Sequence, residues 1–412
     1  MPSQTSRSLI MITEDYDKVG LPGDRNRLFL ARQQRLRDTM AVMGMPVMVV
    51  LDPTSVRYAS GATNMHLFAQ RVPARYLLLF QDGPAILYEY TGSEHLSGGL
   101  PTLNEIRRAE GLCHISSGGD VSVASARFAS EIHSVIQDHD PTIDTLGLDR
   151  FPMQAVDALR DKGLKLVDAD PVLSEARKIK LEEELPWIRE AVRRVEAGVR
   201  RLEENLAPGK TETEAWAELH FEVMAKQGQF LSTRLFQSGP NTFPYFQEAG
   251  ARRLQSGDLV CLDTDAIGFD GYAVDFSRSF LCGDTGPTRD QRDLYQRARD
   301  QLETNAALLT AGRSYRELAE KAWPVPEEHQ DSRYYCIGHG LGMSGEFPNI
   351  PHRTPGVPYP LVGALEAGMI ICIESYIGST RSGQGVKLED QFLILENGAE
   401  RLSRYPFESA LG

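Results

Sequence analysis

The sequence predicts two domains, of which the first is an α/β domain that ends near Asp170. The chain has 412 residues, and a single hydrophobic core usually stops growing below that size. Apolar, strand-like runs alternate with amphipathic, helix-like runs up to about Asp170, an alternation typical of α/β domains. A charged stretch at residues 175–204 favours one long helix that joins the domains. We therefore expect domain boundaries of 1–174 and 175–412.

In the first domain, the elements follow from periodicity and turn residues. We expect helices at residues 26–43 and 122–138, and strands at 46–51, 75–80, 85–90 and 146–149. Gln81-Asp82-Gly83 stands between two of these strands and predicts a β-hairpin. No glycine-rich motif that could hold a phosphate occurs there, so a nucleotide-binding role is not expected.

In the second domain, the long helix ends at Pro208-Gly209, and Thr211 then begins another helix. Glu214 stands three residues after Thr211, which is the spacing of a capping box. We expect further strands at residues 232–237, 334–337, 369–376 and 385–395, and further helices at 290–309 and 315–323. A hairpin spans residues 259–280.

That hairpin, LVCLDTDAIGFDGYAVDFSRSF, carries three aspartates. The alternation that ends at Asp263 is that of a strand, so Asp263 and Asp265 should project from one face. A turn around Asp270 would bring Asp275 back beside them on the returning strand. Aspartate is also common at strand ends and turns, so the three residues alone fit a structural role as well. Converging carboxylates repel one another unless a cation lies between them.

Three residues further along the chain strengthen the case for a cation. His339 lies between glycines in Gly338-His339-Gly340. Glu374 stands at the end of an apolar strand, and Glu389 stands on the strand that follows it. Acidic side chains are rarely buried without a partner. Five carboxylates and one imidazole are enough for two adjacent ions. The oxygen-rich set favours a hard or borderline ion such as Mn²⁺ or Fe over an all-sulfur zinc site.

Composition excludes several classes of partner. The net charge of -13 and the pI near 5.3 disfavour sequence-independent binding to nucleic acid or anionic lipid. No apolar run is long enough to span a bilayer, and MPSQTSRSLIMITEDYDK lacks the features of a signal peptide. Five scattered cysteines without a C-x-x-C pair fit reduced thiols. We therefore expect a cytoplasmic protein.

The order of these residues, with GHGLG around His339 and VKLED around Glu389, resembles the creatinase/aminopeptidase superfamily of metalloenzymes. The resemblance extends over the whole chain. It implies an α+β fold: a pita-bread C-terminal metallo-domain preceded by a smaller, creatinase-like α/β domain. It also implies a homodimer and two divalent ions (Fe, Mn or Zn), with six metal ligands: Asp263, Asp265, Asp275, His339, Glu374 and Glu389.

The sequence departs from the pattern of the superfamily's peptidases, and these departures indicate which branch of the superfamily it resembles most. Peptidases of the superfamily usually have one aspartate eleven positions before the next, whereas Asp263 and Asp265 lie twelve and ten before Asp275. Peptidases of the superfamily usually have two further histidines, and this chain lacks both. Glu346 stands at the position of one, and the position of the other lies near Phe246. The remaining features look like the dimethylsulfoniopropionate (DMSP) lyase branch, on these segments: Arg57-Tyr58-Ala59, Thr63-Asn64-Met65, Ser238-Gly239-Pro240, Phe246-Gln247-Glu248, Asp263-Thr264-Asp265, Asp275-Phe276-Ser277-Arg278-Ser279 and Lys387-Leu388-Glu389-Asp390-Gln391.

One departure concerns the catalytic base. The lyase branch usually has an acidic residue six positions after the metal histidine, and this chain has Gly345 there. Glu346 or Tyr334 could replace it as the catalytic group, or hydroxide on the metal could serve, or the reaction could differ. Glu346 equally fits a loop contact and Tyr334 a packed strand residue.

The resemblance implies a metal-dependent lyase that removes the α-proton of a small β-substituted carboxylate, converting DMSP to acrylate and dimethyl sulfide. Two alternatives stay open. One is a metal-dependent hydrolase of a C–N bond, such as an Xaa-Pro-type peptidase. The other is a binding module that has lost catalysis, which the retained ligand set disfavours, because unpaired carboxylates are costly without a cation.

Overall fold

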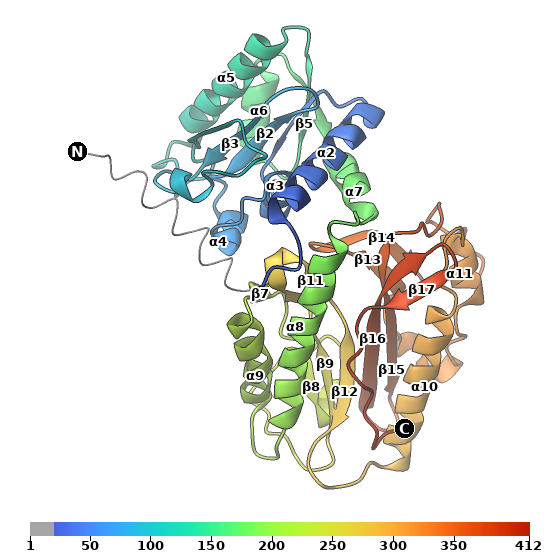
Figure 1. Ribbon diagram of the computed structural model, residues 1–412. Coiled ribbons are helices and arrows are strands. Elements are labelled where there is room, and N and C mark those ends of the chain that lie inside the picture. Colours follow the sequence, from blue (N-terminus) through green and yellow to red (C-terminus); the bar gives the residue numbers. More distant parts are fainter. Residues whose placement is uncertain (1–19) are drawn as a thin grey trace. The chain divides into compact units, whose positions relative to one another are not determined.

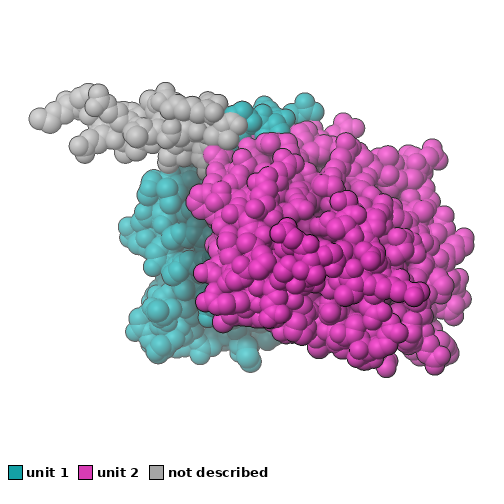
Figure 2. Space-filling model, turned by 90° about the horizontal axis from the view of Figure 1, so that it is seen from below, with its two compact units in different colours: residues 1–177 teal, residues 178–412 magenta. Residues whose placement is uncertain are grey.

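The computed structural model describes residues 20–412, and the chain divides into two compact units, Met1–Arg177 and Lys178–Gly412 (Figures 1 and 2). Residues 1–18, where the sequence predicts no signal peptide, lie outside the described residues. Among the described residues, no helix combines the length and apolar character needed to cross a bilayer. All five cysteines are free thiols, and four of them are buried.

The first unit is a mixed six-stranded sheet with helices packed on it (Figure 1). The strand order is β4-β3-β2-β1-β5-β6; β2 pairs antiparallel with β1 and β3, and the other pairs are parallel. The strands are β1 (Val47–Val50), β2 (Tyr76–Phe80), β3 (Ala85–Glu89), β4 (Glu105–Arg108), β5 (Thr145–Leu148) and β6 (Lys165–Asp168). The helices are α2 (Arg25–Met43), α3 (Pro53–Ser60), α4 (His66–Arg71), α5 (Val121–His139), α6 (Met153–Arg160) and α7 (Asp170–Lys178), with a short 3₁₀ turn at Glu94–Leu96.

The elements predicted for this unit are confirmed to within two residues at each end. The hairpin forms between β2 and β3, with Tyr76 opposite Tyr88. Helix α2 begins where the Asp24 carboxylate accepts hydrogen bonds from two backbone amides of the first turn, and it ends at Gly44 in the left-handed conformation. The central strands β1, β2 and β3 are buried along their whole length, so they form the core of the α/β layer.

The single helix expected at residues 175–204 is wrong. The structure has α7 up to Lys178 and a separate α8 (Leu185–Glu204), which has Pro186 in its first turn. Between them, Ile179 forms a β-bridge with Met369, and the Lys180 amide donates to the Gly368 carbonyl at 2.9 Å. Pairing with a distant segment therefore overrides helix propensity here.

The second unit has its helices on a long curved sheet. Its strand order is β14-β13-β15-β16-β12-β9-β8, with β17 beside β16 and a small sheet β11-β10-β7. The strands are β7 (Phe230–Leu231), β8 (Phe236–Ser238), β9 (Leu259–Asp263), β10 (Ala266–Ile267), β11 (Ala273–Val274), β12 (Ser277–Leu281), β13 (Cys336–Leu341), β14 (Gly345–Pro351), β15 (Ile370–Ser379), β16 (Gln384–Leu395) and β17 (Gly398–Arg401). The remaining helices are α9 (Glu212–Ala225), α10 (Arg289–Ala306) and α11 (Tyr315–Lys321), with 3₁₀ turns at Gly239–Thr242, Phe269–Gly271 and Glu327–Ser332.

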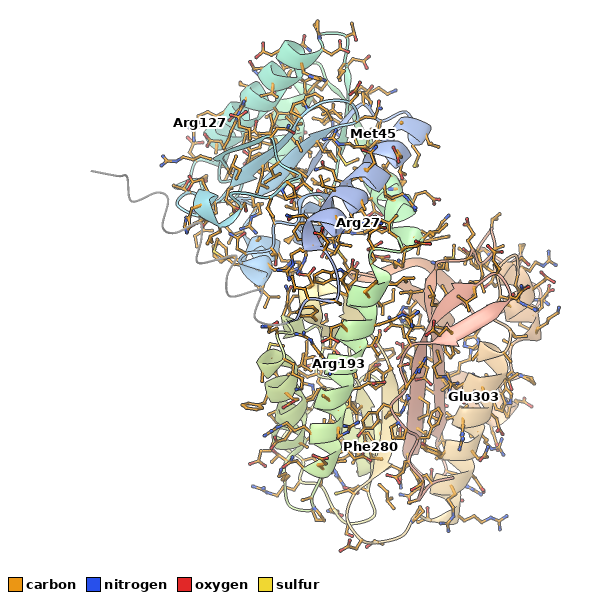
Figure 3. The ribbon with its side chains drawn as sticks, in the orientation of Figure 1. Arg27, Met45, Arg127, Arg193, Phe280 and Glu303 are labelled. Atoms are coloured by element: carbon orange, nitrogen blue, oxygen red, sulfur yellow. The ribbon has the colours of Figure 1, made fainter. Side chains whose placement is uncertain are left out.

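In this unit α8 packs against α9 on one side, and α10 packs on β15 and β16 on the other (Figure 1). In Figure 3, Phe280 of β12 lies in the interior, whereas Glu303 stands on the exposed side of α10, where it pairs with Arg401. The capping box at Thr211 and Glu214 is confirmed. The strand expected at 232–237 has different bounds, because β7 ends at Leu231 and β8 begins at Phe236.

Candidate metal centre

The hairpin that carries the aspartates is formed by β9 and β12, with Asp263 directly opposite Ser277. The strand ends at Asp263, and Asp265 has a φ of 38°, so strand alternation does not orient its side chain as expected. A non-glycine residue in the left-handed region has a strained backbone, and such residues are often found at functional sites. The Thr233 hydroxyl donates to Asp265 Oδ2 at 2.5 Å. Asp275 precedes β12 and is buried.

His339 lies in the middle of β13, opposite Cys372 of β15. An added Cβ at Gly338 would lie 2.4 Å from the Cys372 carbonyl oxygen, and one at Gly340 would lie 2.4 Å from the Phe347 carbonyl oxygen. Glycine on both sides therefore lets the neighbouring strands approach the histidine closely. His339 Nδ1 lies 3.1 Å from the Gly340 carbonyl. Donation to that oxygen leaves Nε2 free to face the carboxylates.

Glu374 of β15 and Glu389 of β16 lie directly opposite each other in an antiparallel pair. Both side chains are buried, with exposed fractions of 1% and 0%. Two carboxylates opposite each other in a sheet repel, so the arrangement destabilises the fold unless a cation is shared.

The imidazole and three carboxylates converge at one point. His339 Nε2 lies 3.3 Å from Glu374 Oε1 and 3.7 Å from both Asp275 Oδ2 and Glu389 Oε1. Donors that each lie about 2.1 Å from one ion stand about 3 to 4 Å apart. Asp275 Oδ1 and Glu389 Oε1 are buried and accept no hydrogen bond within the protein. Buried polar atoms without partners are rare, so these residues fit a divalent cation.

The electrostatics of the cluster agree with this geometry. Burial, followed by the charge of Glu389, raises the pKa of Asp275 well above its ordinary value. Burial, followed by the charge of Asp263, raises the pKa of Asp265 to about 7. Burial by itself would lower the pKa of His339, but the hydrogen bond and charge of Glu374 outweigh it and raise the pKa to about 9. The carboxylates thus compete for positive charge.

Lys387 is a member of the cluster that sequence reasoning missed. Its ammonium is fully buried and lies 2.7 Å from Glu374 Oε2, 2.8 Å from Glu389 Oε2 and 3.3 Å from Asp263 Oδ2. Burial opposes its charge, but these carboxylates raise its pKa well above the ordinary value. The signal was present in the sequence, because Lys387 and Glu389 are two residues apart on one strand and share a face.

Other neighbours hold Asp263 and contribute a sulfur atom. Asp263 accepts hydrogen bonds from the Tyr245 hydroxyl at 2.7 Å and the Ser277 hydroxyl at 2.8 Å. Burial favours protonation of Asp263, yet Lys387 and these hydroxyls keep its pKa below the ordinary value. Cys372 Sγ lies within 4.8 Å of donor atoms from Asp275, His339 and Glu389. Among residues 20–412, this is the one group of three or more such side chains close enough to share an ion.

The two candidate catalytic residues have different surroundings. The Glu346 carboxylate pairs with Lys180 at 2.7 Å, with both side chains 2% exposed, and accepts the Met343 amide at 3.1 Å. A Cβ at Gly342 would lie 2.4 Å from that carboxylate, so glycine makes room for it. Tyr334 instead packs against the cluster, with Lys387 Nζ 4.8 Å from its ring centroid.

A group of aromatic rings extends from Tyr334. Phe246 lies 5.5 Å from Tyr334 and Tyr335 lies 4.8 Å from it, between ring centroids. Phe246 and Tyr335 are 54% and 58% exposed, while Tyr334 is 9% exposed. The group therefore runs from the buried carboxylates to the surface of the unit.

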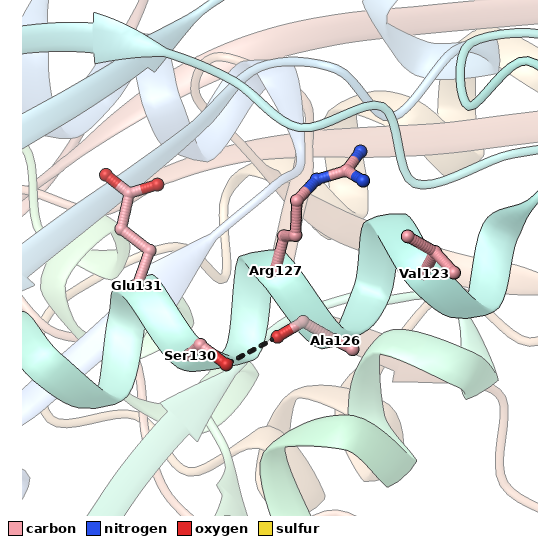
Figure 4. A pocket seen from close by; sticks show the side chains of 5 residues that line it. All are labelled: Val123, Ala126, Arg127, Ser130 and Glu131. Atoms are coloured by element: carbon pink, nitrogen blue, oxygen red, sulfur yellow. Dashed lines mark hydrogen bonds between the residues drawn. The ribbon is translucent and has the colours of Figure 1, made fainter.

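A separate surface hollow lies on α5 of the first unit (Figure 4). It is lined by Val123, Ala126, Arg127, Ser130 and Glu131. Arg127 forms a two-pronged ion pair with Glu110, and the Ser130 hydroxyl donates to the Ala126 carbonyl. Glu131 pairs with Arg107 at 3.4 Å. Both charged side chains of the lining therefore have partners outside it, and the hollow has no group that resembles the cluster around His339.

Comparison with known proteins agrees with the fold. The chain is 34% identical over 398 residues to the "Dimethylsulfoniopropionate lyase DddP" of Roseovarius nubinhibens, covering 95% of this chain and 89% of the relative. It is 25% identical to the "Xaa-Pro dipeptidase" of Pyrococcus furiosus, over 78% of this chain and 91% of that one. The solved structure of the prolidase from Pyrococcus furiosus superposes with a TM-score of 0.71, at 23% identity, over 89% of this chain and 99% of that one. This likeness confirms the expected pita-bread fold.

The family model "Metallopeptidase family M24" matches residues 186–396, which include all six expected metal ligands. The superfamily resemblance read from the sequence is thereby confirmed. This chain belongs to metallopeptidase family M24.

Proposed function

We propose that this protein is a dinuclear metal-dependent carbon–sulfur lyase acting on a small β-substituted carboxylate, with DMSP as the first substrate to test. The observation that carries the proposal is the aromatic surface beside the carboxylate cluster. It puts a binding face for an onium group next to a binding site for a carboxylate, and DMSP contains both groups. The similarity to a relative named as a DMSP lyase, over 95% of this chain, supports it.

The carboxylate end of the substrate would meet the cluster. Six residues would hold the ions: Asp263, Asp265, Asp275, His339, Glu374 and Glu389. Divalent ions bound there would neutralise the substrate carboxylate and stabilise the negative charge that develops beside it as the α-proton leaves.

The sulfonium end would meet the aromatic rings. Phe246 and Tyr335 offer exposed ring faces, and cations bind aromatic faces with about 0.5–2 kcal/mol each. In the sequence, Phe246 stands near a position where peptidases of the superfamily usually have a histidine. An apolar ring there suits a methylated sulfonium better than it suits acid–base chemistry on a peptide bond.

We assign the proton transfer to Tyr334 in preference to Glu346. Glu346 is held by Lys180 and the Met343 amide, whereas Tyr334 packs beside Lys387. Burial, followed by the charge of Glu374, raises the pKa of Tyr334 well above its ordinary value, and the charge of Lys387 opposes this. Tyr334 must therefore first give its hydroxyl proton to solvent, a loss that the positive charge of bound ions would favour. In the proposed step the phenolate so formed takes the α-proton, the C–H electron pair forms the C=C bond of acrylate, and the C–S pair leaves on sulfur as neutral dimethyl sulfide. Loss of this group should lower kcat by about 10²- to 10⁴-fold.

The test is direct detection of both products. Metal-loaded protein is given DMSP, dimethyl sulfide is measured by gas chromatography of the headspace, and acrylate is measured by proton NMR. Tyr334→Phe should abolish most turnover with little change in metal content, and Glu346→Gln should retain it. Loss of turnover in Glu346→Gln, with turnover retained in Tyr334→Phe, would return the assignment to Glu346. No product from protein that holds its metal ions would contradict the lyase.

Gly345 provides a gain-of-function test. A Cβ at this position meets no atom within 4 Å, so the first side-chain atom of an aspartate displaces no neighbour there. Gly345→Asp supplies the acidic side chain that the lyase branch usually has at this place, and we expect it to raise kcat by about tenfold or more. An unchanged rate would mean that position 345 takes no part in the reaction.

Hydrolysis of a C–N bond is the second candidate, because the family match and the Xaa-Pro dipeptidase relative point to it. The same preparation is offered Xaa-Pro dipeptides, and free proline is measured. Proline release at a higher kcat/KM than DMSP cleavage would favour this candidate.

The accompanying properties are also proposals. We propose two divalent ions (Fe, Mn or Zn), a homodimer and a cytoplasmic location. Metal analysis by mass spectrometry and light scattering after gel filtration would test the first two, and cell fractionation the third.

A further inference from the structure

The two halves of the curved sheet meet at one residue pair. In the described part of the chain, β12 pairs with β16 at Ser277 and Glu389, whereas β16 pairs with β15 along most of its length (Figure 1). Beside this pair a side chain replaces the usual ladder, because the Ser279 hydroxyl donates to the Lys387 carbonyl at 2.9 Å and accepts the Lys387 amide at 3.2 Å. We call this junction between β12 and β16 the seam.

The expected metal ligands come from both sides of the seam. Asp263, Asp265 and Asp275 belong to the β9–β12 hairpin, and His339, Glu374 and Glu389 belong to β13, β15 and β16. Ions that bind both sets need the two sides to keep a fixed register and separation, because metal–ligand distances vary little.

Arg278 joins the two sides of the seam from the face of the sheet opposite the carboxylate cluster. On the cluster side, the Ser277 hydroxyl donates to Glu389 Oε2 at 3.0 Å. Arg278 and Asp390 are the next residues on the two strands, so they point to the other face, where they pair at 2.8 Å. Arg278 Nη1 also donates to the Ser277 and Glu389 carbonyls, both at 2.9 Å. One guanidinium thus holds the backbone of both strands at a metal ligand.

The segment that follows β17, residues 402–412, surrounds the rest of this guanidinium. The Tyr405 carbonyl accepts Arg278 Nη2 at 2.6 Å and Nε at 3.0 Å, and the Pro406 carbonyl lies 3.3 Å from Nε. The Phe407 ring centroid lies 4.7 Å from the guanidinium carbon. Arg278 is 1% exposed, and each of its three side-chain nitrogens donates to an oxygen. A planar guanidinium can satisfy these acceptors together, whereas an ammonium cannot.

Two helices fix the position of residues 402–412. The Tyr405 hydroxyl donates to Glu203 of α8. The Glu408 amide donates to the Tyr295 hydroxyl of α10 at 2.8 Å. The oxygens that face Arg278 are therefore held by the helices on both sides of the unit.

We propose that Arg278, seated on residues 402–412, holds the seam in register and thereby keeps the two sets of metal ligands at the distances that shared ions need. Arg278 acts through Ser277 and Glu389, so it is a positioning residue. The proposal rests on the metal centre of the proposed function and not on the identity of the substrate.

Arg278→Lys tests this role in the full-length protein. Lysine keeps a positive charge beside Asp390, but its one nitrogen cannot bond the carbonyls of Ser277, Glu389 and Tyr405 together. Metal-free protein, checked for folding by circular dichroism, is titrated with Mn²⁺ by calorimetry, and the Kd should rise by about 10- to 100-fold. The visible absorption of bound Co²⁺ reports the ligand geometry and should also change. An unchanged Kd and Co²⁺ spectrum in folded Arg278→Lys would overturn the proposal alone, whereas a wild type that binds no metal would overturn the metal centre with it.

Two further variants separate this role from a general loss of stability. Phe407→Leu keeps Arg278 and removes the ring against it, so the Kd should rise by about two- to fivefold. If Arg278→Lys does not fold, an unchanged Kd in Phe407→Leu overturns the proposal. Arg75→Lys is the matched control, because Arg75 is 4% exposed and pairs with Glu89 in the first unit. It should lower stability and leave the Kd and the Co²⁺ spectrum as in the wild type. An equal rise of the Kd in Arg75→Lys would mean that lost stability, and not the seam, weakens metal binding.

Discussion

Glu89 in the first unit and Glu389 in the second are both buried glutamates with an exposed fraction of 0%. Glu89 Oε1 pairs with Arg75 Nε at 2.7 Å and accepts the Tyr90 amide, and Glu89 Oε2 accepts the Ser97 hydroxyl. Both of its oxygens are thus satisfied by the chain itself. Glu389 Oε2 is satisfied by Lys387 and Ser277, but Glu389 Oε1 accepts no hydrogen bond within the protein.

The difference separates a structural ion pair from a functional site. A buried charge is tolerated when its partner and hydrogen bonds lie in the same fold. Around Glu389 the carboxylates outnumber the cations that the cluster itself supplies, so the balance must come from outside the chain. Surplus buried charge of one sign, more than burial as such, marks the metal centre.

The largest expected effect, on metal content and turnover, comes from removing one of the excess carboxylates of the metal centre. Glu389→Ala should lose bound metal and lower turnover by about 1,000-fold or more, because an ion and its charge stabilisation are worth several kcal/mol. Metal analysis and product formation are measured together. Glu396→Ala, an exposed glutamate just after β16, serves as control. Retention of metal in Glu389→Ala would remove this residue from the ligand set.

Removing the carboxylate of the buried ion pair between Glu89 and Arg75 should affect stability and not metal binding. Glu89→Ala leaves Arg75 buried without its partner, and we expect the free energy of unfolding to fall by about 3–5 kcal/mol. Urea unfolding followed by circular dichroism measures this loss, and the metal content should stay as in the wild type. Glu105→Ala breaks an exposed pair with Arg107 and should leave the urea midpoint nearly unchanged. Loss of metal in Glu89→Ala would contradict the assignment of Glu89 to a structural ion pair that is separate from the metal centre.

Asp149 extends the comparison to a buried carboxylate held by backbone amides. It accepts the Leu51 amide at 2.6 Å and the Asp52 amide at 3.2 Å, yet burial raises its pKa to about 7. The folded-state pKa lies above the unfolded value, so this contribution to stability is complete below about pH 4 and is lost as the pH rises through about 7.

We therefore expect the unfolding free energy of the first unit to fall by about 2–4 kcal/mol between pH 4 and pH 8. Asp149→Asn should flatten this dependence, as measured by urea unfolding at several pH values. A slope that is the same in both proteins would assign it to other groups.

The smallest expected effect tests whether stability and metal binding are separable in the second unit. Thr211→Ala removes the side-chain cap of α9 and the capping box with Glu214, which should cost about 1 kcal/mol. The thermal midpoint should fall slightly, while the metal content stays as in the wild type. Weaker metal binding in this variant would mean that the helix end and the metal centre are coupled.

Most of the secondary structure could be predicted from the sequence, and so could the convergence of His339 with Asp275, Glu374 and Glu389. Hydrophobic periodicity identified β2, β3, α5, α10, β15 and β16, and capping residues located the start of α9, because both signals are local. Buried carboxylates at the ends of apolar strands pointed to a cation, because burial of unpaired charge is costly wherever it occurs.

Tertiary structure decided the rest. The pairing of residues 179–180 with residues 368–369 broke the long helix. The Lys180 partner of Glu346 comes from 166 residues away. The left-handed backbone of Asp265 and the place of Lys387 between three carboxylates depend on strand registers that no single segment encodes. Periodicity reports which face of a strand is buried, but only the register between distant strands determines which charges meet there.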